Sequence, residues 1–325
     1  MRENIVLESM PSDIILEQAK ELYDLDNFVF IRKMENIVYS AMQQKQKVYV
    51  RFTSPLRRAR HEIRSELDWM QFLFKYGFSV PRIIKNKYLE PSTTLIHQAE
   101  KFEVCVFNEV IGQHPTHTQM MDANFLQRIG ALIAKMHEAT LHYIPEVSDF
   151  YREQWYEERG IRHAIAAKSR TSDLEMREKF EEMVLLLSSC SRNHENYGLI
   201  HSDIGRENIL LEKNMLSVID FDDSCFHWHV FDIAIVVYFL SLKNQQIMSS
   251  EMLDDCVVNL VTGYRSVRYL PDEEVELIPH FIIFAFLRLY FWIEDHQFLD
   301  TFHEKVKVNV EELKQKARDC VVFYS

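Results

Sequence analysis

Two polar motifs lie close together in the second half of the sequence, and their residue types suit phosphoryl transfer to a hydroxyl group. The 201–208 loop sets His201, Asp203 and Asn208 in H-x-D-x-x-x-x-N spacing, and the 219–223 turn reads Ile-Asp-Phe-Asp-Asp. Phosphoryl transfer requires a group that accepts the hydroxyl proton and oxygen ligands for Mg²⁺. Asp203 can accept the proton, while the oxygens of Asn208 and Asp220 can bind the metal. A polar turn beside a hydrophobic hairpin is the alternative, but the two motifs in this order favour the chemistry.

Both motifs resemble those of the aminoglycoside/choline phosphotransferase family, whose members share the eukaryotic protein-kinase-like fold. That family writes its loop as H-x-D-x-x-x-x-N and its metal-binding turn as I-D-[FW]-[DE], as residues 201–208 and 219–222 do here. The resemblance implies that Asp203 is the catalytic base and that Asn208 and Asp220 bind magnesium. It also implies ATP as the donor and a small hydroxyl-bearing molecule as the acceptor.

The resemblance assigns supporting roles to neighbouring side chains. His201 would brace the loop, and Asp222 would bind the metal through water or contact the acceptor. Asp232 would hold the loop from the start of a helix, with contact to the substrate as the alternative. Trp228 lies just beyond the 219–223 turn and is a candidate for the wall of the acceptor pocket.

Upstream, the resemblance indicates a nucleotide-binding half. Lys47-Val-Tyr-Val-Arg-Phe52 stands where the family has its nucleotide-binding strand, and Arg51 replaces the usual lysine. Arginine is a permanent cation whose fork suits phosphate oxygens. The following helix should offer this cation a carboxylate. The family's E-x-x-W/L pattern falls on Glu66 and Trp69, with Glu62, one turn away, as the alternative.

Two further segments complete this half. Residues 35–39, Glu-Asn-Ile-Val-Tyr, resemble the loop that covers the phosphates, but they contain no glycine for close backbone contact. Side-chain bonding by Asn36 would replace that contact, unless the segment is an ordinary hairpin turn. Residues 106–112 match the hinge between lobes. There the backbone of three consecutive residues would bind adenine: Asn108, Glu109 and Val110.

The elements around these motifs predict an α+β protein with a bilobal, protein-kinase-like fold. Strands are expected over about 27–32, 36–42, 47–52, 92–98 and 102–110, and helices over about 12–24 and 58–76. Later helices are expected over about 122–140, 151–168, 172–192, 230–243, 250–268, 272–297 and 301–319, with a hairpin at 209–219. We therefore expect an antiparallel sheet lobe with one helix over 1–108, a hinge over 109–114, and a larger helical lobe over 115–325.

Composition excludes several classes of protein. A chain of 325 residues with 47% apolar content suits a globular enzyme with two cores. Its net charge of −12 argues against nucleic-acid binding. The basic cluster at 57–64 is interpreted as a solvated helix start. Five scattered cysteines without C-x-x-C spacing indicate neither a zinc site nor a disulfide framework, which fits a cytoplasmic protein.

No membrane association is expected from the sequence. The first residues carry charges throughout and lack the apolar region of a signal peptide. The most apolar stretch, 277–293, is interrupted by Pro279, His280 and Arg288. Such a stretch is too short and too polar to span a bilayer, so we expect a buried helix.

Three functions stay open on the sequence alone. A small-molecule kinase, as a monomer or homodimer, leads, and aminoglycosides, choline, homoserine, hydroxylysine and methylthioribose are all acceptors of enzymes with such motifs. A protein Ser/Thr kinase is disfavoured because the H-R-D, D-F-G and A-P-E wording is missing. A pseudokinase that serves as a binding or structural module, of the spore-coat kind, is kept open by the glycine-free loop and by Arg51.

Overall fold

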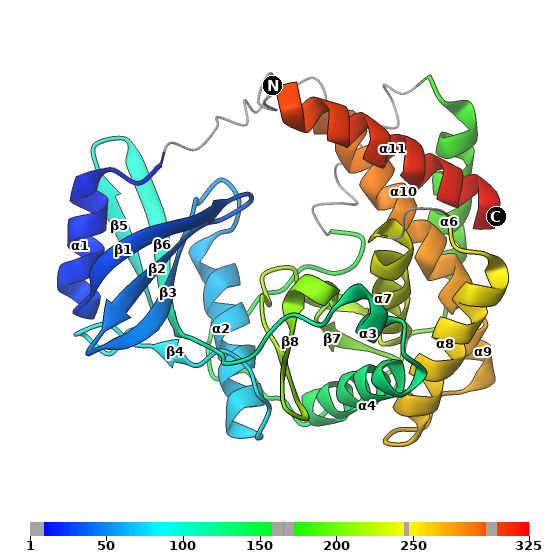
Figure 1. Ribbon diagram of the computed structural model, residues 1–325, viewed down its shortest axis with the longest axis horizontal. Helices are drawn as coiled ribbons and strands as arrows, with labels where there is room; N and C mark the ends of the chain where they lie inside the picture. Colours follow the sequence, from blue (N-terminus) through cyan, green and yellow to red (C-terminus); the bar gives the residue numbers. More distant parts are fainter. Residues whose placement is uncertain (1–9, 158–164, 166–171, 244–246, 297–303, 325) are drawn as a thin grey trace. The chain divides into compact units, whose positions relative to one another are not determined.

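The computed structural model describes residues 10–157, 165, 172–243, 247–296 and 304–324, which form two compact units (Figure 1). Unit 1 comprises Met1–Gln113, Tyr143–Arg152 and Leu210–Asp222. Unit 2 comprises His114–His142, Glu153–Ile209 and Asp223–Ser325. The sequence assigned everything after the hinge to one lobe, whereas residues 143–152 and 210–222 pack with the first unit.

Unit 1 is built on a six-stranded antiparallel sheet in the order β1-β2-β3-β6-β4, with β5 paired to β6. Its strands are β1 (Asp26–Lys33), β2 (Ile37–Gln43), β3 (Gln46–Thr53), β4 (Ile83–Ile84), β5 (Ser92–His97) and β6 (Glu100–Asn108). Gln44 and Lys45 join β2 to β3 with φ values of 49° and 67°. Two successive positive φ angles are the mark of a tight hairpin turn, and this turn fixes the register of β3.

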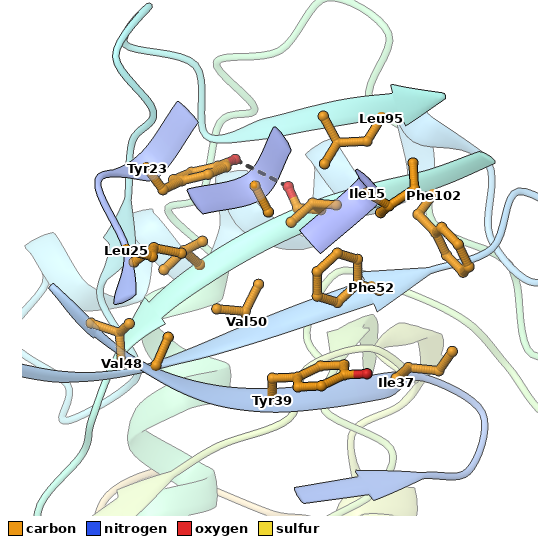
Figure 2. Packing of buried hydrophobic residues seen from close by; sticks show 14 residues of the cluster. Ile15, Tyr23, Leu25, Ile37, Tyr39, Val48, Val50, Phe52, Leu95 and Phe102 are labelled. Atoms are coloured by element: carbon orange, nitrogen blue, oxygen red, sulfur yellow. Dashed lines mark hydrogen bonds between the residues drawn. The ribbon is translucent and has the colours of Figure 1, made fainter. Parts of the chain in front are cut away.

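One face of this sheet is covered by α1 (Asp13–Tyr23), as Figures 1 and 2 show. Side chains alternate between the two faces of a strand. Along β3, Val48, Val50 and Phe52 are therefore buried together in the core under α1 (Figure 2). The Tyr23 hydroxyl at the end of α1 donates a hydrogen bond of 3.1 Å to the Val104 carbonyl, which ties the helix to β6.

The other face of β3 presents Arg51 to α2 (Arg60–Lys75). The apolar residues of α2 recur at helical spacing, and Ile63, Leu67 and Met70 are buried. Glu66 lies in the same buried stripe and is only 1% exposed. Alternation along the strand and periodicity along the helix thus bring a cation and a carboxylate into the interior together.

The predicted hairpin at 209–219 is present as β8 (Ile209–Glu212) and β9 (Met215–Val218). From Leu210 onward it belongs to unit 1. Gln113, at the end of the hinge, pairs with Leu211, and the Val218 N–H donates to the Ser79 carbonyl at 3.1 Å. The first contact anchors β8, and the second anchors the end of β9, after which the 219–223 turn begins.

Unit 2 is mainly helical. Its helices are α3 (His117–Met120), α4 (Ala123–Thr140), α6 (Leu174–Ser189), α7 (Val230–Lys243), α8 (Ser250–Arg265), α9 (Asp272–Val275), α10 (Ile278–His296) and α11 (Glu304–Tyr324). Helices α4 and α8 approach closely at two glycines. A Cβ at Gly130 would lie 2.0 Å from the Leu260 carbonyl oxygen, and one at Gly263 would lie 1.8 Å from that of Gln127. Any larger residue at either position would push the helices apart.

Helix α10 is long and largely apolar. The most apolar 18-residue window of Asp272–Glu294 has a mean hydropathy of 1.5, so this segment is long and apolar enough to cross a membrane, contrary to the expectation from sequence. However, 61% of its most apolar window is buried inside the protein. Phe281, Phe284 and Leu287 are fully buried in unit 2. This burial agrees with the core helix expected at this position.

Two short strands frame the motifs, and the sequence did not predict them. Strand β7 (Tyr197–Ile200) pairs antiparallel with β10 (Cys225–Trp228). The helix expected over 151–168 does not begin at its predicted start, because the Trp155 N–H donates to the Phe226 carbonyl at 2.8 Å in a bridge beside β10. Beyond residue 157, all of that predicted helix except residue 165 lies outside the described residues.

Candidate active site

Asp203 and Asn208 are in direct contact across the 201–208 loop of unit 2, between β7 and β8. The Asn208 Nδ2 donates to the Asp203 carbonyl oxygen at 2.8 Å and to its carboxylate Oδ2 at 2.7 Å. A single 3₁₀ turn, η1 (Arg206–Asn208), closes the loop. Within the described residues, the amide oxygen of Asn208 accepts no hydrogen bond. It therefore remains available as a ligand for a hard cation.

The loop backbone is held by Asp232, which is completely buried in the first turn of α7. Its carboxylate accepts from the His201 N–H at 3.1 Å and from the Ser202 N–H at 2.6 Å. The buried His201 ring accepts from the Asp203 N–H at its Nδ1, at 3.3 Å. Ser202 has a φ of 67°, which few residues with a side chain adopt. The two anchors thus hold a strained backbone beside Asp203.

A buried polar chain continues from Asp232 to α4 and α8. The His137 Nε2 donates to the Asp232 Oδ2 at 3.0 Å, and its Nδ1 accepts from the Tyr264 hydroxyl at 3.0 Å. Burial lowers the pKa of His137 to about 3 and raises the pKa of Asp232 to about 6. At neutral pH a neutral imidazole therefore donates to a carboxylate. The close packing of α4 on α8 brings His137 and Tyr264 together, and no sequence motif indicated this contact.

Three buried histidines of unit 2 should make the protein less stable in acid. Burial holds the pKa of His137, His227 and His229 below the ordinary value of 6.5, so the unfolded chain binds protons that the folded chain cannot. Each histidine then lowers the free energy of unfolding by about 1.4 kcal/mol for every pH unit below 6.5. The raised pKa of Asp232 offsets part of this cost below pH 6. We expect the free energy of unfolding, from urea titrations, to fall by roughly 3 kcal/mol between pH 7.5 and 5.5.

A matched control removes one imidazole and keeps its acceptor. The backbone N–H of Trp228 donates to the His227 Nδ1 at 2.9 Å. An asparagine at position 227 can accept the same hydrogen bond through its side-chain oxygen. In His227→Asn the acid loss should therefore shrink by about 1.4 kcal/mol. A stability that stays flat or rises toward pH 5.5 would contradict this account.

Arg51 and Glu66 form a buried, bidentate ion pair in unit 1. The Arg51 Nη1 and Nη2 donate to the two Glu66 carboxylate oxygens at 2.8 and 2.7 Å. Glu62, the alternative partner, instead accepts from the Ala59 N–H at 2.7 Å and lies 3.4 Å from Arg58. Glu66, and not Glu62, is therefore the ion-pair partner of Arg51. The Arg51 Nε is buried and has no hydrogen-bond partner in the described part of the chain.

The three hinge residues use their backbone groups differently. The Asn108 N–H donates to the Arg82 carbonyl at 3.0 Å, and the Glu109 N–H donates to that of Lys47 at 3.3 Å. Among the residues that the structure describes, the N–H and C=O of Val110 make no hydrogen bond. These two groups are a hydrogen-bond donor and an acceptor next to each other on extended backbone, and together they can bind the polar edge of a planar ring.

The turn between β1 and β2 is held by side chains. The Thr53 hydroxyl donates to the Asn36 Oδ1 at 2.8 Å, and the Asn36 Nδ2 donates to the Asp222 Oδ2 at 3.0 Å. Glu35 forms an ion pair with Arg57, which also pairs with Asp222. Side-chain bonds within the protein thus occupy Asn36 where protein kinases have glycines.

Asp220 has a left-handed backbone, with a φ of 64°. Its Oδ2 accepts from the Arg32 Nη2 at 2.8 Å, and its side chain is 26% exposed. The next residue, Phe221, is completely buried and packs edge-to-face on Trp69 of α2, with 5.3 Å between ring centroids. The positive φ therefore buries the phenyl ring and leaves the neighbouring carboxylate accessible.

Asp222 is enclosed by arginines of unit 1. The Arg57 Nε donates to its Oδ2 at 3.0 Å, and its carbonyl accepts from Arg58 at 3.2 Å and Arg152 at 2.5 Å. Burial alone would raise its pKa, but Arg57, Arg51 and Arg58 hold that pKa well below its usual range. These contacts favour an anchoring role over contact with the acceptor. They also correct part of the prediction of a solvated basic cluster, because Arg58 is 3% exposed, whereas the side chain of Arg60 is 52% exposed.

A cavity of about 150 Å³ opens in unit 2 beside Asp203. The residues that matter for its chemistry are Ser202, Asp203, Asp223, Tyr238, Arg288 and Trp292. Asp223 thus lines the cavity, while the sequence analysis assigned a site role only to Asp222. The doubled aspartate in the 219–223 turn was the signal, but it does not tell which of the two residues lines the cavity.

Trp228 is not part of the cavity wall, contrary to expectation. It is 1% exposed, and its Nε1 donates to the Ser191 carbonyl at 3.0 Å. The ring lies 5.1 Å from the Arg192 guanidinium and 5.5 Å from the Trp155 ring. Cation–π contact and a satisfied N–H hold this indole in the core of unit 2.

Known proteins resemble this chain in sequence and in fold. A model of the phosphotransferase enzyme family matches residues 30–264. Amicoumacin kinase from Bacillus subtilis (strain 168) is 22% identical over 304 residues, which are 90% of this chain and 88% of that protein. The structure of amicoumacin kinase hAmiN in complex with AMP-PNP, Ca²⁺ and Ami superposes with a TM-score of 0.81 at 22% identity, covering 95% of this chain and 94% of that one.

A microcompartment-associated aminopropanol kinase superposes with a TM-score of 0.75 at 22% identity, covering 96% of this chain and 97% of that one. At these identities the superpositions speak for the fold. The α+β, protein-kinase-like fold predicted from the sequence is confirmed.

Proposed function

The chain belongs to the phosphotransferase enzyme family, and we propose that it is a small-molecule kinase that transfers the γ-phosphoryl group of ATP to a hydroxyl group. The observation that carries this proposal is Asp203. It lines a cavity of unit 2, and its carboxylate is held by the amide of Asn208 at 2.7 Å. We propose that this carboxylate accepts the proton of the acceptor hydroxyl as its oxygen attacks the phosphorus.

We propose Asn208 and Asp220 as the magnesium ligands. Within the described residues, each has an oxygen that accepts no hydrogen bond: Oδ1 of Asn208 and Oδ1 of Asp220. Oxygens of amides and carboxylates are the donors that Mg²⁺ prefers, so the donor set fits the metal. Magnesium, when bound, neutralises phosphate charge. The AMP-PNP and Ca²⁺ in the amicoumacin kinase structure support a nucleotide and a divalent cation.

We propose that unit 1 binds the nucleotide. Glu66 orients the guanidinium of Arg51, whose buried Nε–H is left for a phosphate oxygen. The backbone of Asn108, Glu109 and Val110 would face adenine, and Val110 has the N–H and C=O available for it. Asn36 would contribute from the β1–β2 turn by exchanging its present bonds. We also propose a cytoplasmic location, where the five cysteines, all free in the structure, stay reduced.

An ADP-release screen over amino alcohols, hydroxylated amino acids, sugars and aminoglycosides tests the proposed function. We expect ADP with at least one of these acceptors in the presence of Mg²⁺. Mg-ATP at 100 times its Kd should also stabilise the native state by about 2.7 kcal/mol, which raises the melting temperature by several degrees.

The screen separates the other two functions. Transfer to a generic protein substrate, with no transfer to any metabolite, would instead indicate a protein kinase. If millimolar Mg-ATP neither shifts the melting temperature nor yields ADP, the chain is a binding or structural module.

A further inference from the structure

The cavity beside Asp203 carries charges of both signs. Two acidic residues, Asp203 and Asp223, and one basic residue, Arg288, line the same small space of unit 2. The reaction proposed above assigns a task to Asp203 only. The other two residues have no task in that reaction, and their place in the cavity wall makes them candidates for recognition of the acceptor.

Arg288 lies on the core helix α10, and its orientation is fixed by packing. Its guanidinium carbon lies 5.5 Å from the centroid of the Phe231 ring, which is fully buried at the start of α7. Burial lowers the pKa of Arg288 to about 10, so the side chain remains a cation at neutral pH. A cation removed from water gains when an anion binds beside it.

Ser202 adds a polar group to the same wall. Its hydroxyl is buried and has no hydrogen-bond partner in the part of the chain that the structure describes. The bonds of Asp232 to the backbone hold Ser202 in the left-handed conformation described above. A buried hydroxyl without a partner is unfavourable, and a ligand with an acceptor oxygen would satisfy it.

The size of the cavity limits the part of the acceptor that enters. A volume of about 150 Å³ holds a guest about the size of benzene. Amino-acid-sized molecules fit this limit, while a multi-ring aminoglycoside does not. Tyr238 and Trp292 add aromatic surface to the wall, against which a short aliphatic chain can pack.

Resting on the proposed kinase function, we propose that the acceptor is a small hydroxylated amino acid. Its carboxylate binds Arg288 and the Ser202 hydroxyl, its ammonium group binds Asp223, and its own hydroxyl faces Asp203. The bond between the γ-phosphorus of ATP and the oxygen shared with the β-phosphorus breaks as the new phosphorus–oxygen bond forms at that hydroxyl. ADP leaves with the shared oxygen, and the proton of the hydroxyl goes to Asp203.

Three pairs of compounds that differ by one carboxylate test this inference: L-threonine with 1-amino-2-propanol, L-homoserine with 3-amino-1-propanol, and L-serine with ethanolamine. Titration calorimetry without nucleotide measures binding, and ADP release measures kcat/KM. In at least one pair, the amino acid should be favoured by about 100-fold or more over its decarboxylated partner, because a site that bonds a polar group rejects the analogue that lacks it.

Variants of Arg288 connect that preference to the guanidinium. In Arg288→Met the ratio of Kd values within the best pair should fall by about 100-fold, toward one. Arg288→Lys keeps a positive charge and should retain an intermediate ratio. Lys135→Met removes an exposed positive charge from α4 of the same unit and should leave the ratio unchanged. Circular dichroism and melting temperature establish that each variant is folded.

The outcomes distinguish this inference from the kinase function. A preference for the amino alcohols, or a carboxylate preference that survives in Arg288→Met, overturns the amino acid assignment while ADP release still supports a kinase. Binding of an amino acid that depends on Arg288, without ADP from any acceptor, supports the pocket assignment and removes the kinase proposal.

Discussion

Replacing Asp203 by asparagine should lower kcat about 1,000-fold, because a positioned general base contributes on the order of 10²–10⁴ to the rate. Asparagine keeps the size of the side chain and can still accept the hydrogen bond that the Asn208 Nδ2 makes at 2.7 Å. It cannot take up a proton. The affinity for Mg-ATP should change little, since the loss concerns the acceptor hydroxyl alone. Steady-state kinetics with the acceptor found in the screen, and calorimetry with Mg-ATP, measure the two quantities.

Glu207→Gln provides the control from the same loop. Glu207 pairs with Arg206 at 2.9 Å, and its side chain is 54% exposed. Its substitution removes one negative charge near Asp203 and should leave kcat within about twofold. If Asp203→Asn keeps more than a tenth of the wild-type kcat, Asp203 is not the base. If it also loses Mg-ATP binding, its role lies with the metal and not with the proton.

Much of unit 1 was predictable, because its signals are local. The alternation along Lys47–Phe52 separates three core residues from Arg51 on the opposite face, and β3 has this pattern. The periodicity of α2 places Glu66 among its buried residues. An ion pair between elements then follows from two local patterns, and Glu66 occupies the position that the family pattern indicated.

Strands β7 and β10 could not be predicted from the sequence because they are short and because they pair across a long separation in the chain. Strands β7 and β10 have four residues each, too few for alternation to be distinguished from chance. Their paired residues lie 25 to 31 positions apart in the sequence, with Tyr197 opposite Trp228 and Ile200 opposite Cys225. The segment predicted as a helix from residue 151 lies against β10, where bonds between distant segments override local propensity.

The site itself shows the same limit. Asp222 and Asp223 are adjacent and chemically identical, and no property of the turn tells them apart. Asp222 is buried because Arg57 and Arg152, which come from segments far from the turn, bind it. Arg288 of α10 lines the cavity, whereas in the sequence it was noted only as a polar interruption of an apolar stretch. The environments of Asp222, Asp223 and Arg288 thus depend on tertiary structure and not on local sequence.

Removing one partner of the Arg51–Glu66 pair should cost more stability than removing both. Glu66→Leu leaves the buried Arg51 cation without its carboxylate, and breaking such a pair typically costs about 3–5 kcal/mol. In Arg51→Met/Glu66→Leu two apolar side chains fill the space, and stability should return to within about 1–2 kcal/mol of the wild type. Urea titrations followed by tryptophan fluorescence, to which Trp69 of α2 contributes, measure the free energy of unfolding.

The double variant also separates stability from nucleotide binding. It should fold, yet it lacks the Nε–H that we assign to a phosphate oxygen, so kcat/KM for ATP should fall about 100-fold. Glu146→Leu breaks an exposed ion pair of the same unit, 2.8 Å from Lys75, and should change stability little. If Glu66→Leu is no more destabilising than this control, the buried pair does not stabilise unit 1. If the double variant binds Mg-ATP as the wild type does, Arg51 is a structural residue, and the nucleotide phosphates must be held by other groups.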